Sequence, residues 1–272
     1  ALGLIADLEI QLPISVAASN VKSTLRQIPV SKRHASDLSL LLATIDKFQS
    51  SIPHLRRDLR QGSARLLSRA YLGQPDLTIY ALGRTEVIKK GRVITTGDWK
   101  SRTARDLFFC LLSHPEGLSK EQIGLVFWPD CSPRLLKSRF KNAIYRLRSA
   151  IGQDVVRYED NVYRFNRSLD YEYDVESFVG GLADAESKDN PRDQINAYQI
   201  ALQHHRGTYL AETDMAWRVT ENERLHRAYL EANLSLAYLH FQMGQVDDAL
   251  QCCYRILEQD PCLEDGHRLA MR

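Results

Sequence analysis

The spacing of hydrophobic positions changes twice along the chain and divides it into three parts. Residues 1–75 have apolar side chains at three- and four-residue intervals, clearest over Ser36–Ser50 and again over His54–Tyr71, which predicts helices. Three prolines are expected to break this part into pieces: Pro13, Pro29 and Pro53. We interpret residues 1–75 as a small helical domain or the tail of a helical sensor array, and the sequence does not indicate its role.

Between residues 76 and 169 the period first shortens to that of β-strands. Three β-rich segments separated by turn residues predict a small antiparallel sheet: Leu77–Leu82, Thr85–Lys89 and Arg92–Thr95. Helical spacing returns in three stretches that begin near Ser101, Ser119 and Ser132. Two alternating segments then flank a polar tip and predict a hairpin: Asp154–Tyr158 and Val162–Asn166. Strands, three helices and a hairpin in this order describe a winged helix-turn-helix.

Residues 170–272 have helical spacing throughout. Separate helices are predicted around Val175–Ala185 and Ile195–Leu202, followed by a long helical pattern over Met215–Gln242. Within Leu230–Cys262, small and apolar residues stand at the spacings of a 34-residue helical repeat: Leu236, Ala237, Gly244, Ala249 and Pro261. The predicted fold class is mainly α with a small β component, a winged helix-turn-helix domain followed by a TPR-like helical domain.

The segment from Ser132 to Gly152 is the most informative stretch of the chain. Ser132 suits an N-cap, Pro133 the first helical position and Gly152 a helix end. Six apolar residues recur at three- and four-residue intervals and predict one buried stripe: Leu136, Phe140, Ala143, Ile144, Leu147 and Ile151. Between Arg134 and Ile151 there are six Lys/Arg and no Asp or Glu.

A helix without acidic residues cannot form i,i+4 ion pairs, so its free face is expected to attract an anion. On a helical wheel, five polar residues lie opposite the buried stripe and are candidates for reading bases in the DNA major groove: Arg134, Ser138, Lys141, Asn142 and Tyr145. Four cations flank this face and are candidate phosphate contacts: Lys137, Arg139, Arg146 and Arg148. Lys100 and Arg102, at the start of an earlier helix, are further candidates. A solvated basic face is the alternative interpretation.

The formal net charge of +2 conceals an uneven distribution. Residues 1–75 hold 10 Lys/Arg and 5 Asp/Glu, residues 76–169 hold 17 and 10, and residues 170–272 hold 9 and 19. A basic middle followed by an acidic end predicts one part that meets nucleic acid and one that does not. The acidic end is interpreted as a protein-binding or self-association module. A further hypothesis, motivated only by the contrast in charge, is that it masks the basic helix until a signal arrives.

Cysteine usage and hydropathy bear on the compartment. The five cysteines have no CxxC or Cys/His zinc spacing, and Cys110, Cys252 and Cys253 fall in apolar helical runs. Reduced core cysteines indicate the cytoplasm, where a DNA-binding protein would associate with the nucleoid. No apolar run approaches the roughly 20 residues that cross a bilayer. The chain starts at Ala1 and ends within a helical pattern, so we expect a piece of a longer protein.

Signatures of catalysis are not found in the sequence. It contains no GxxxxGK[ST], GxGxxG or HExxH motif, and no receiver-type phosphorylation site is identified. His204 and His205 stand together near a helix end without an obvious third partner, and paired acids such as Asp247 and Asp248 fit solvated helix faces. We therefore expect neither enzyme activity nor a cofactor or metal. A scaffold whose basic helix binds an acidic protein is the competing function.

Several local motifs carry a resemblance to a known family. They are LG-x-x-E-V from residue 82, R-x-A-R-D-L-x-x-x-L-L-x-H-P from residue 102, F-W-P-D from residue 127, R-L-R-x-A-I-G from residue 146, and Y-R-F at 163–165. The run resembles the OmpR-type winged-helix DNA-binding domain, and more narrowly its version in SARP-type bacterial transcriptional activators. In that family a TPR-like bacterial transcriptional activation domain follows directly. The resemblance covers residues 77–272 and assigns 76–169 and 170–272 to the two domains.

The resemblance implies a sequence-specific activator that binds double-stranded DNA on direct repeats and contacts RNA polymerase. One feature departs from the family pattern. The tip of the predicted wing carries Glu159 and Asp160, whereas wings of this fold approach phosphate or the minor groove. Either Arg157, Arg164 and Arg167 make that contact, or the wing contributes little.

Overall fold

A computed structural model of the chain describes residues 22–27, 35–58 and 74–272. In the first two ranges the chain forms the helices α2 (Lys22–Leu25) and α3 (Ala35–Asp58). The ammonium group of Lys22 donates to the Gln49 side chain at 2.8 Å and pairs with Asp46, which ties α2 to α3. Pro13 and Pro29 lie outside the described residues.

The expected break at Pro53 is wrong, because α3 continues through this proline to Asp58. A proline deletes one helical hydrogen bond and crowds the preceding turn, but a helix with several turns before it can continue past that site. The first five positions of the expected helix His54–Tyr71 therefore belong to α3, and positions 59–71 lie outside the described residues.

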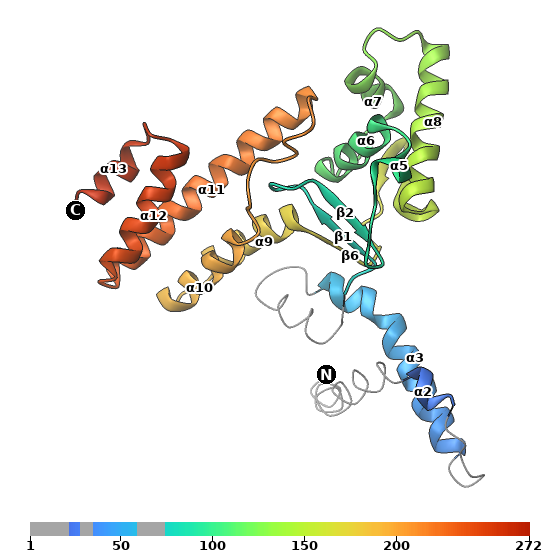
Figure 1. Ribbon diagram of the computed structural model, residues 1–272, viewed down its shortest axis with the longest axis horizontal. Helices are drawn as coiled ribbons and strands as arrows, with labels where there is room; N and C mark the ends of the chain where they lie inside the picture. Colours follow the sequence, from blue (N-terminus) through green and yellow to red (C-terminus); the bar gives the residue numbers. More distant parts are fainter. Residues whose placement is uncertain (1–21, 28–34, 59–73) are drawn as a thin grey trace.

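A four-stranded sheet lies at the centre of residues 74–272 (Figure 1). Its order is β3-β2-β1-β6, formed by Arg92–Val93, Glu86–Lys89, Leu77–Tyr80 and Tyr171–Tyr173. The three antiparallel strands that the sequence predicts are confirmed, whereas β6 was not predicted. It pairs in parallel with β1, with Leu77 opposite Tyr171. The sheet thus extends past residue 169, where the sequence places a domain boundary.

Four helices and a hairpin follow β3. The short helix α5 (Thr96–Trp99) precedes the three predicted helices, which span Arg102–Ser113 (α6), Lys120–Phe127 (α7) and Pro133–Ile151 (α8). A 3-10 turn, Gln153–Val155 (η1), leads into the hairpin of β4 (Val156–Glu159) and β5 (Val162–Phe165). Ser119 and Gln122 form a capping box at the start of α7. The predicted order of strands, three helices and hairpin is therefore present.

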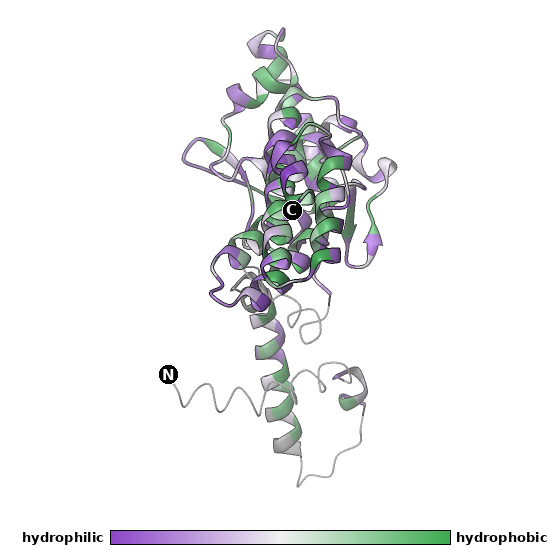
Figure 2. Cartoon of the chain, turned by 90° about the vertical axis from the view of Figure 1, so that its left-hand side faces the viewer, coloured by the Kyte–Doolittle hydropathy of each residue, from purple (hydrophilic) through white to green (hydrophobic). Residues whose placement is uncertain are grey.

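Each of the remaining helices packs against the next one in the chain. They span Asp174–Glu186 (α9), Pro191–Leu202 (α10), Ala216–Gln242 (α11), Val246–Gln259 (α12) and Glu264–Ala270 (α13). Gly244 adopts φ +73° in the turn between α11 and α12, a conformation that favours glycine. Figure 2 shows hydrophobic and hydrophilic segments interleaved along these helices. The fold class predicted from the sequence, mainly α with a small β component, is confirmed.

The sheet connects the two groups of helices that Figure 1 shows on either side of it. The loop between α10 and α11 returns to β1, where the amide of Leu210 donates to the Ala81 carbonyl at 2.8 Å and the Gly83 amide to the Thr208 carbonyl at 3.1 Å. Buried residues from β1 through α13 form a continuous hydrophobic core. The orientation of α8 is fixed by packing against α5, α6, α7 and the hairpin.

Candidate nucleic-acid interface

Helix α8 begins and ends where the sequence predicts. Pro133 occupies its first turn, and Gly152 closes it with φ 147°, its amide donating to the Arg148 carbonyl at 2.9 Å. Ser132 holds the N-cap position with extended backbone, but its side chain makes no capping hydrogen bond. The start of α8 thus depends on the fixed φ of Pro133 rather than on a hydroxyl cap.

One side of α8 packs into the core. Five of the six predicted stripe residues are buried, namely Phe140, Ala143, Ile144, Leu147 and Ile151. The sixth, Leu136, is half-buried and lies against Gly124 of α7. The Phe140 ring meets the ring of Tyr163 on β5 edge to face, with centroids 4.7 Å apart. Helix α8 is therefore held between α6, α7 and the hairpin.

The opposite side of α8 is open. All five base-reading candidates are exposed there: Arg134, Ser138, Lys141, Asn142 and Tyr145. Tyr145 keeps 65% of its surface accessible, which is unusual for an aromatic residue on a packed helix. Within residues 22–27, 35–58 and 74–272, no carboxylate pairs with any Lys or Arg of α8. The face is cationic and not neutralised in this state.

The masking interpretation of the acidic end finds no support in this arrangement. Acidic groups beyond residue 170 pair with cations elsewhere: Glu176 with Arg167, Glu212 with Arg105, and Glu221 with Arg224. Because the C-terminal helices lie across the sheet from α8 (Figure 1), their carboxylates reach other surfaces. The acidic part therefore pairs with cations of the middle part at Arg105 and Arg167, but its carboxylates do not pair with α8 in the described residues.

The structure separates the phosphate candidates into two groups. Lys137, Arg139 and Arg146 are exposed on the flanks of α8. Arg148 is half-buried instead and donates to the Val156 carbonyl at 3.0 Å, so it stabilises the return of the chain from η1 into β4. Sequence spacing could not reveal this role, because the acceptor belongs to the strand that follows the helix.

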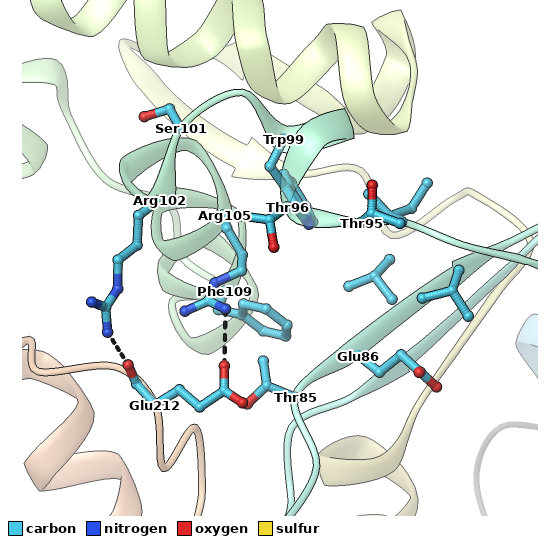
Figure 3. A pocket seen from close by; sticks show the side chains of 13 residues that line it. Thr85, Glu86, Thr95, Thr96, Trp99, Ser101, Arg102, Arg105, Phe109 and Glu212 are labelled. Atoms are coloured by element: carbon cyan, nitrogen blue, oxygen red, sulfur yellow. Dashed lines mark hydrogen bonds and ion pairs between the residues drawn. The ribbon is translucent and has the colours of Figure 1, made fainter.

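Lys100 and Arg102 lie close in sequence but face different surroundings. Lys100 is exposed, adopts φ 54° and lines a hollow together with Ser149, near the end of α8. Arg102 points toward the C-terminal half, where it donates to the Glu212 carbonyl and lies 3.8 Å from the Asp214 carboxylate (Figure 3). Beside it, Arg105 pairs with the Glu212 carboxylate at 3.1 Å. Arg102 therefore does not share a surface with the exposed side of α8.

The cations of the hairpin are engaged within the protein. Arg157 donates to the Ser168 hydroxyl at 2.8 Å and lies 3.9 Å from Glu159. Arg164 donates to the Glu116 carbonyl at 2.9 Å and lies 3.8 Å from Asp160. At the tip, Asp160 and Asn161 have φ values of 51° and 66°, as a tight hairpin turn requires. Of the two interpretations of the acidic wing, this arrangement favours a minor contribution to DNA contact.

Three cations beside α8 were missed as candidates. Lys89, Lys90 and Arg92 surround the β2–β3 turn, and all three line the hollow that contains Lys100. Their sequence signal was the Lys-Lys-Gly-Arg run, which indicated a turn because Lys90 and Gly91 are typical turn residues. The residue types of a turn do not predict its tertiary position, so the sequence did not indicate that this turn lies beside the end of α8.

Neither a metal centre nor a membrane span stands out. In the ranges that the structure describes, no three His, Cys, Asp or Glu side chains gather as metal ligands. The helices of those same ranges are too short or too polar to cross a bilayer. All five cysteines are free, and Cys110, Cys252 and Cys253 are buried as expected, while Cys131 is half-buried and Cys262 exposed.

Comparisons with known proteins agree with this architecture. Residues 173–272 match the family described as bacterial transcriptional activator domain. The fold is similar to a solved structure titled Mycobacterium tuberculosis EmbR in complex with low affinity phosphopeptide, with a TM-score of 0.60 and 15% identity. That similarity covers 73% of this chain and 54% of the EmbR chain, so it extends over about half of that protein. A search of curated protein sequences gives no significant match.

These findings concern the C-terminal part of the chain and the fold of about three quarters of it. The match to the bacterial transcriptional activator domain lies at residues 173–272, the position that the resemblance predicts. At 15% identity, the likeness to EmbR shows a shared fold. The match supports the predicted SARP-type resemblance for the C-terminal half. For residues 76–169 the resemblance continues to rest on their own motifs and on the order of strands, helices and hairpin.

Proposed function

We propose that the chain is a sequence-specific double-stranded DNA-binding transcriptional regulator of the SARP type, and that it acts as an activator. The observation that carries the proposal is the exposed face of α8, where Arg134, Lys141 and Asn142 project from a helix whose other side is buried. A cationic helix face without acidic partners is the electrostatic footprint of nucleic-acid binding. The bacterial transcriptional activator domain at 173–272 adds support from the other half of the chain.

Base reading would follow from the side chains on this face. Arg134 and Lys141 are suited to the guanine O6 and N7 acceptors, and Asn142 is suited to adenine. Tyr145 and Ser138 complete the row and can contact a base edge or a thymine methyl group. A major groove about 12 Å wide accepts one α-helix, so these five residues can meet base edges together.

Phosphate contacts would come from the exposed cations around this row. Lys137, Arg139 and Arg146 flank it on α8, and Lys100 lies beyond the end of the helix. If about four phosphates are neutralised, the logarithm of the affinity should fall with the logarithm of the salt concentration with a slope near −4. Such a dependence separates DNA binding from a helix that is only solvated.

The C-terminal helical domain would serve regulation and protein contacts. The resemblance implies RNA polymerase as a partner. Outside the C-terminal helices, two apolar side chains beside the α7–α8 turn are exposed and could contact a protein partner: Leu125 at 70% and Leu135 at 45%. Tyr254, 60% exposed on α12, favours a further contact or self-association through the C-terminal helices. We place the protein in the cytoplasm, associated with the nucleoid. The structure of EmbR includes a phosphopeptide, and a protein ligand for this chain is part of the same proposal.

A catalytic role is not part of the proposal. Burial raises the pKa of the Cys110 thiol to about 12, so this cysteine stays protonated and is a poor nucleophile at neutral pH. Burial also lowers the pKa of His205 to about 4, and its ring stacks on Tyr229 with centroids 4.2 Å apart. Both groups behave as parts of the core.

The test is selection of genomic DNA fragments by the purified chain, followed by affinity measurements on the enriched sequence. Combined Arg134→Ala, Lys141→Ala and Asn142→Ala changes should abolish preference for that sequence. Arg192→Ala on α10 removes an exposed cation far along the chain and should have no effect, which makes it a matched control. Intact sequence preference in the triple variant would refute the role of α8.

A protein scaffold is the second candidate, because exposed apolar residues lie next to the basic helix. In that case α8 would bind an acidic protein surface, and Leu125 and Leu135 would contribute apolar contacts. Enrichment of no DNA sequence, together with salt-sensitive binding of acidic peptides, would favour the scaffold over the regulator.

A further inference from the structure

A cationic hollow of about 540 Å³ adjoins the C-terminal end of α8. We call it the lysine hollow and define it by the residues that matter for its charge and position: Lys89, Lys90, Arg92, Asp98, Lys100 and Ser149. The first three belong to β2, β3 and the turn between them, and the next two to α5 and its end. Ser149 lies on the same exposed face of α8 as Tyr145. The base-reading row therefore runs directly to the hollow.

The charge of the lysine hollow is largely uncompensated. Asp98 is its one carboxylate among the described lining residues, and this group is already saturated. It accepts the Thr95 amide at 2.8 Å, the Thr95 hydroxyl at 2.7 Å and the Arg92 guanidinium at 2.9 Å. The Thr95 hydrogen bonds, and secondarily Arg92, hold the pKa of Asp98 below its usual value. Across the described ranges, no carboxylate pairs with Lys89, Lys90 or Lys100.

The position of the hollow matches the path of a DNA backbone. Helix α8 has 19 residues, and at 1.5 Å per residue it is roughly 28 Å long. The helix is straight, whereas the major groove curves around the duplex. When the row from Arg134 to Tyr145 faces bases, the last turns of the helix therefore leave the groove. Ser149 and the hollow then lie where the sugar–phosphate backbone runs.

Electrostatics at a helix end explains why extra cations are needed there. The C-terminus of a helix carries a partial negative charge on its last carbonyl groups, which disfavours a nearby phosphate. The ammonium groups beside Ser149 offset that charge. We propose that the lysine hollow binds a backbone phosphate of the same DNA duplex, beyond the base pairs read by α8. This inference rests on the proposed DNA-binding function and extends its footprint to the β2–β3 turn.

The test compares three proteins by titration with DNA at several salt concentrations. The first is the unmodified chain. The second carries Lys89→Gln, Lys90→Asn and Lys100→Asn, where asparagine is chosen because Lys90 and Lys100 have φ values of 49° and 54°. The third carries Arg192→Gln, Arg227→Gln and Arg255→Gln, which removes the same charge from exposed positions on α10, α11 and α12. Thermal unfolding confirms that all three are folded.

We expect the hollow variant to bind the selected sequence and random DNA about tenfold more weakly, with a log–log salt slope reduced in magnitude by about 1–2. The three-arginine control should keep the slope of the unmodified chain. Shortening the duplex on the flank next to the end of α8 should abolish the difference between hollow variant and unmodified chain, because the phosphate is then missing.

Three results would overturn the inference, and they are distinguishable. In the first, the salt slope of the hollow variant is unchanged, while the triple change at Arg134, Lys141 and Asn142 abolishes sequence preference. The proposed DNA-binding function would then hold, but the hollow would not contact the DNA. Normal affinity for one site but lost joint occupancy of two adjacent sites would mean that the hollow binds the acidic wing tip, Glu159 and Asp160, of a second copy. No DNA binding by the unmodified chain would remove the proposed function and the inference together.

Discussion

The Asp174 carboxylate accepts the main-chain amide of Ala81 with both of its oxygens, at 3.0 and 2.8 Å. The amide of Leu82 donates to the same carboxylate at 2.9 Å. Asp174 opens α9, and Ala81 and Leu82 follow β1, so one buried side chain joins the sheet to the C-terminal helices. In effect it provides acceptors for β1 beyond the point where strand pairing with β6 ends.

Asp174→Ala should destabilise the protein strongly. The substitution leaves the amides of Ala81 and Leu82 buried without acceptors, and each such group costs about 1–3 kcal/mol. We expect the free energy of unfolding to fall by roughly 3 kcal/mol in a denaturant titration. Asp184→Ala, in the same helix but paired only with Lys188, should change it by less than about 1 kcal/mol. Equal losses at the two positions would contradict the role assigned to Asp174.

The same carboxyl group makes stability depend on pH. Burial raises the pKa of Asp174 to about 6, which outweighs the opposite effect of its amide hydrogen bonds. An unfolded aspartate has a pKa of about 3.9, so between these values the folded chain binds the extra proton. The contribution of Asp174 to stability is thus greatest below about pH 4 and is lost as pH rises through 6.

Asp174→Asn isolates this contribution, because asparagine keeps the shape but does not titrate. From pH 5 to pH 7.5, the unmodified chain should lose about 1 kcal/mol of unfolding free energy relative to the Asn variant. Denaturant titrations of both proteins at each pH cancel the effects of the other carboxyl groups. Parallel pH profiles would show that Asp174 has an ordinary pKa.

Adjacent glycines of α9 should respond to alanine in opposite directions. A Cβ at Gly181 would lie 2.8 Å from the Ala201 Cβ of α10, whereas a Cβ at Gly180 meets nothing within 4 Å. Gly180→Ala should therefore stabilise the protein by about 0.5–1 kcal/mol through helix propensity. Gly181→Ala should destabilise it by roughly 1–3 kcal/mol, because α9 and α10 must separate. Thermal unfolding measures both, and a shift of the same sign would refute the close approach of these helices.

Sequence periodicity predicted the local elements well, and α8 shows why. Pro133, Gly152 and the apolar stripe between them are all local signals, so the helix bounds and its buried side followed from the sequence. The exposure of the opposite face of α8 could be predicted from the same local signals. Strand β6 was missed for the converse reason. It has three residues, and its partner β1 lies more than 90 positions earlier, so no local pattern marks it.

The surface proposed to bind DNA could be predicted only where it depends on a single helix. Arg102 and Arg148 were assigned to phosphate by their neighbours in sequence, but their acceptors, the carbonyls of Glu212 and Val156, come from segments that folding brings near. Lys89 and Lys90 were overlooked because only the tertiary fold places the β2–β3 turn beside Ser149. The sequence gives the charge of each side chain, but the partner of that side chain depends on which segments pack beside it in the folded protein.

Single substitutions on α8 should separate base reading from phosphate binding. Asn142→Ala removes a side chain suited to adenine, so it should cost about 1–3 kcal/mol on the selected sequence and relax the preference at one base pair. Lys137→Ala should weaken binding to every sequence about equally and reduce the magnitude of the salt slope by about 1. Both side chains are exposed, so neither change should lower the melting temperature. Competition titrations against a library of single-base variants measure the preference at each position. If Lys137→Ala altered the preferred base, or Asn142→Ala weakened all sequences alike, the assignment of the two faces would have to be reversed.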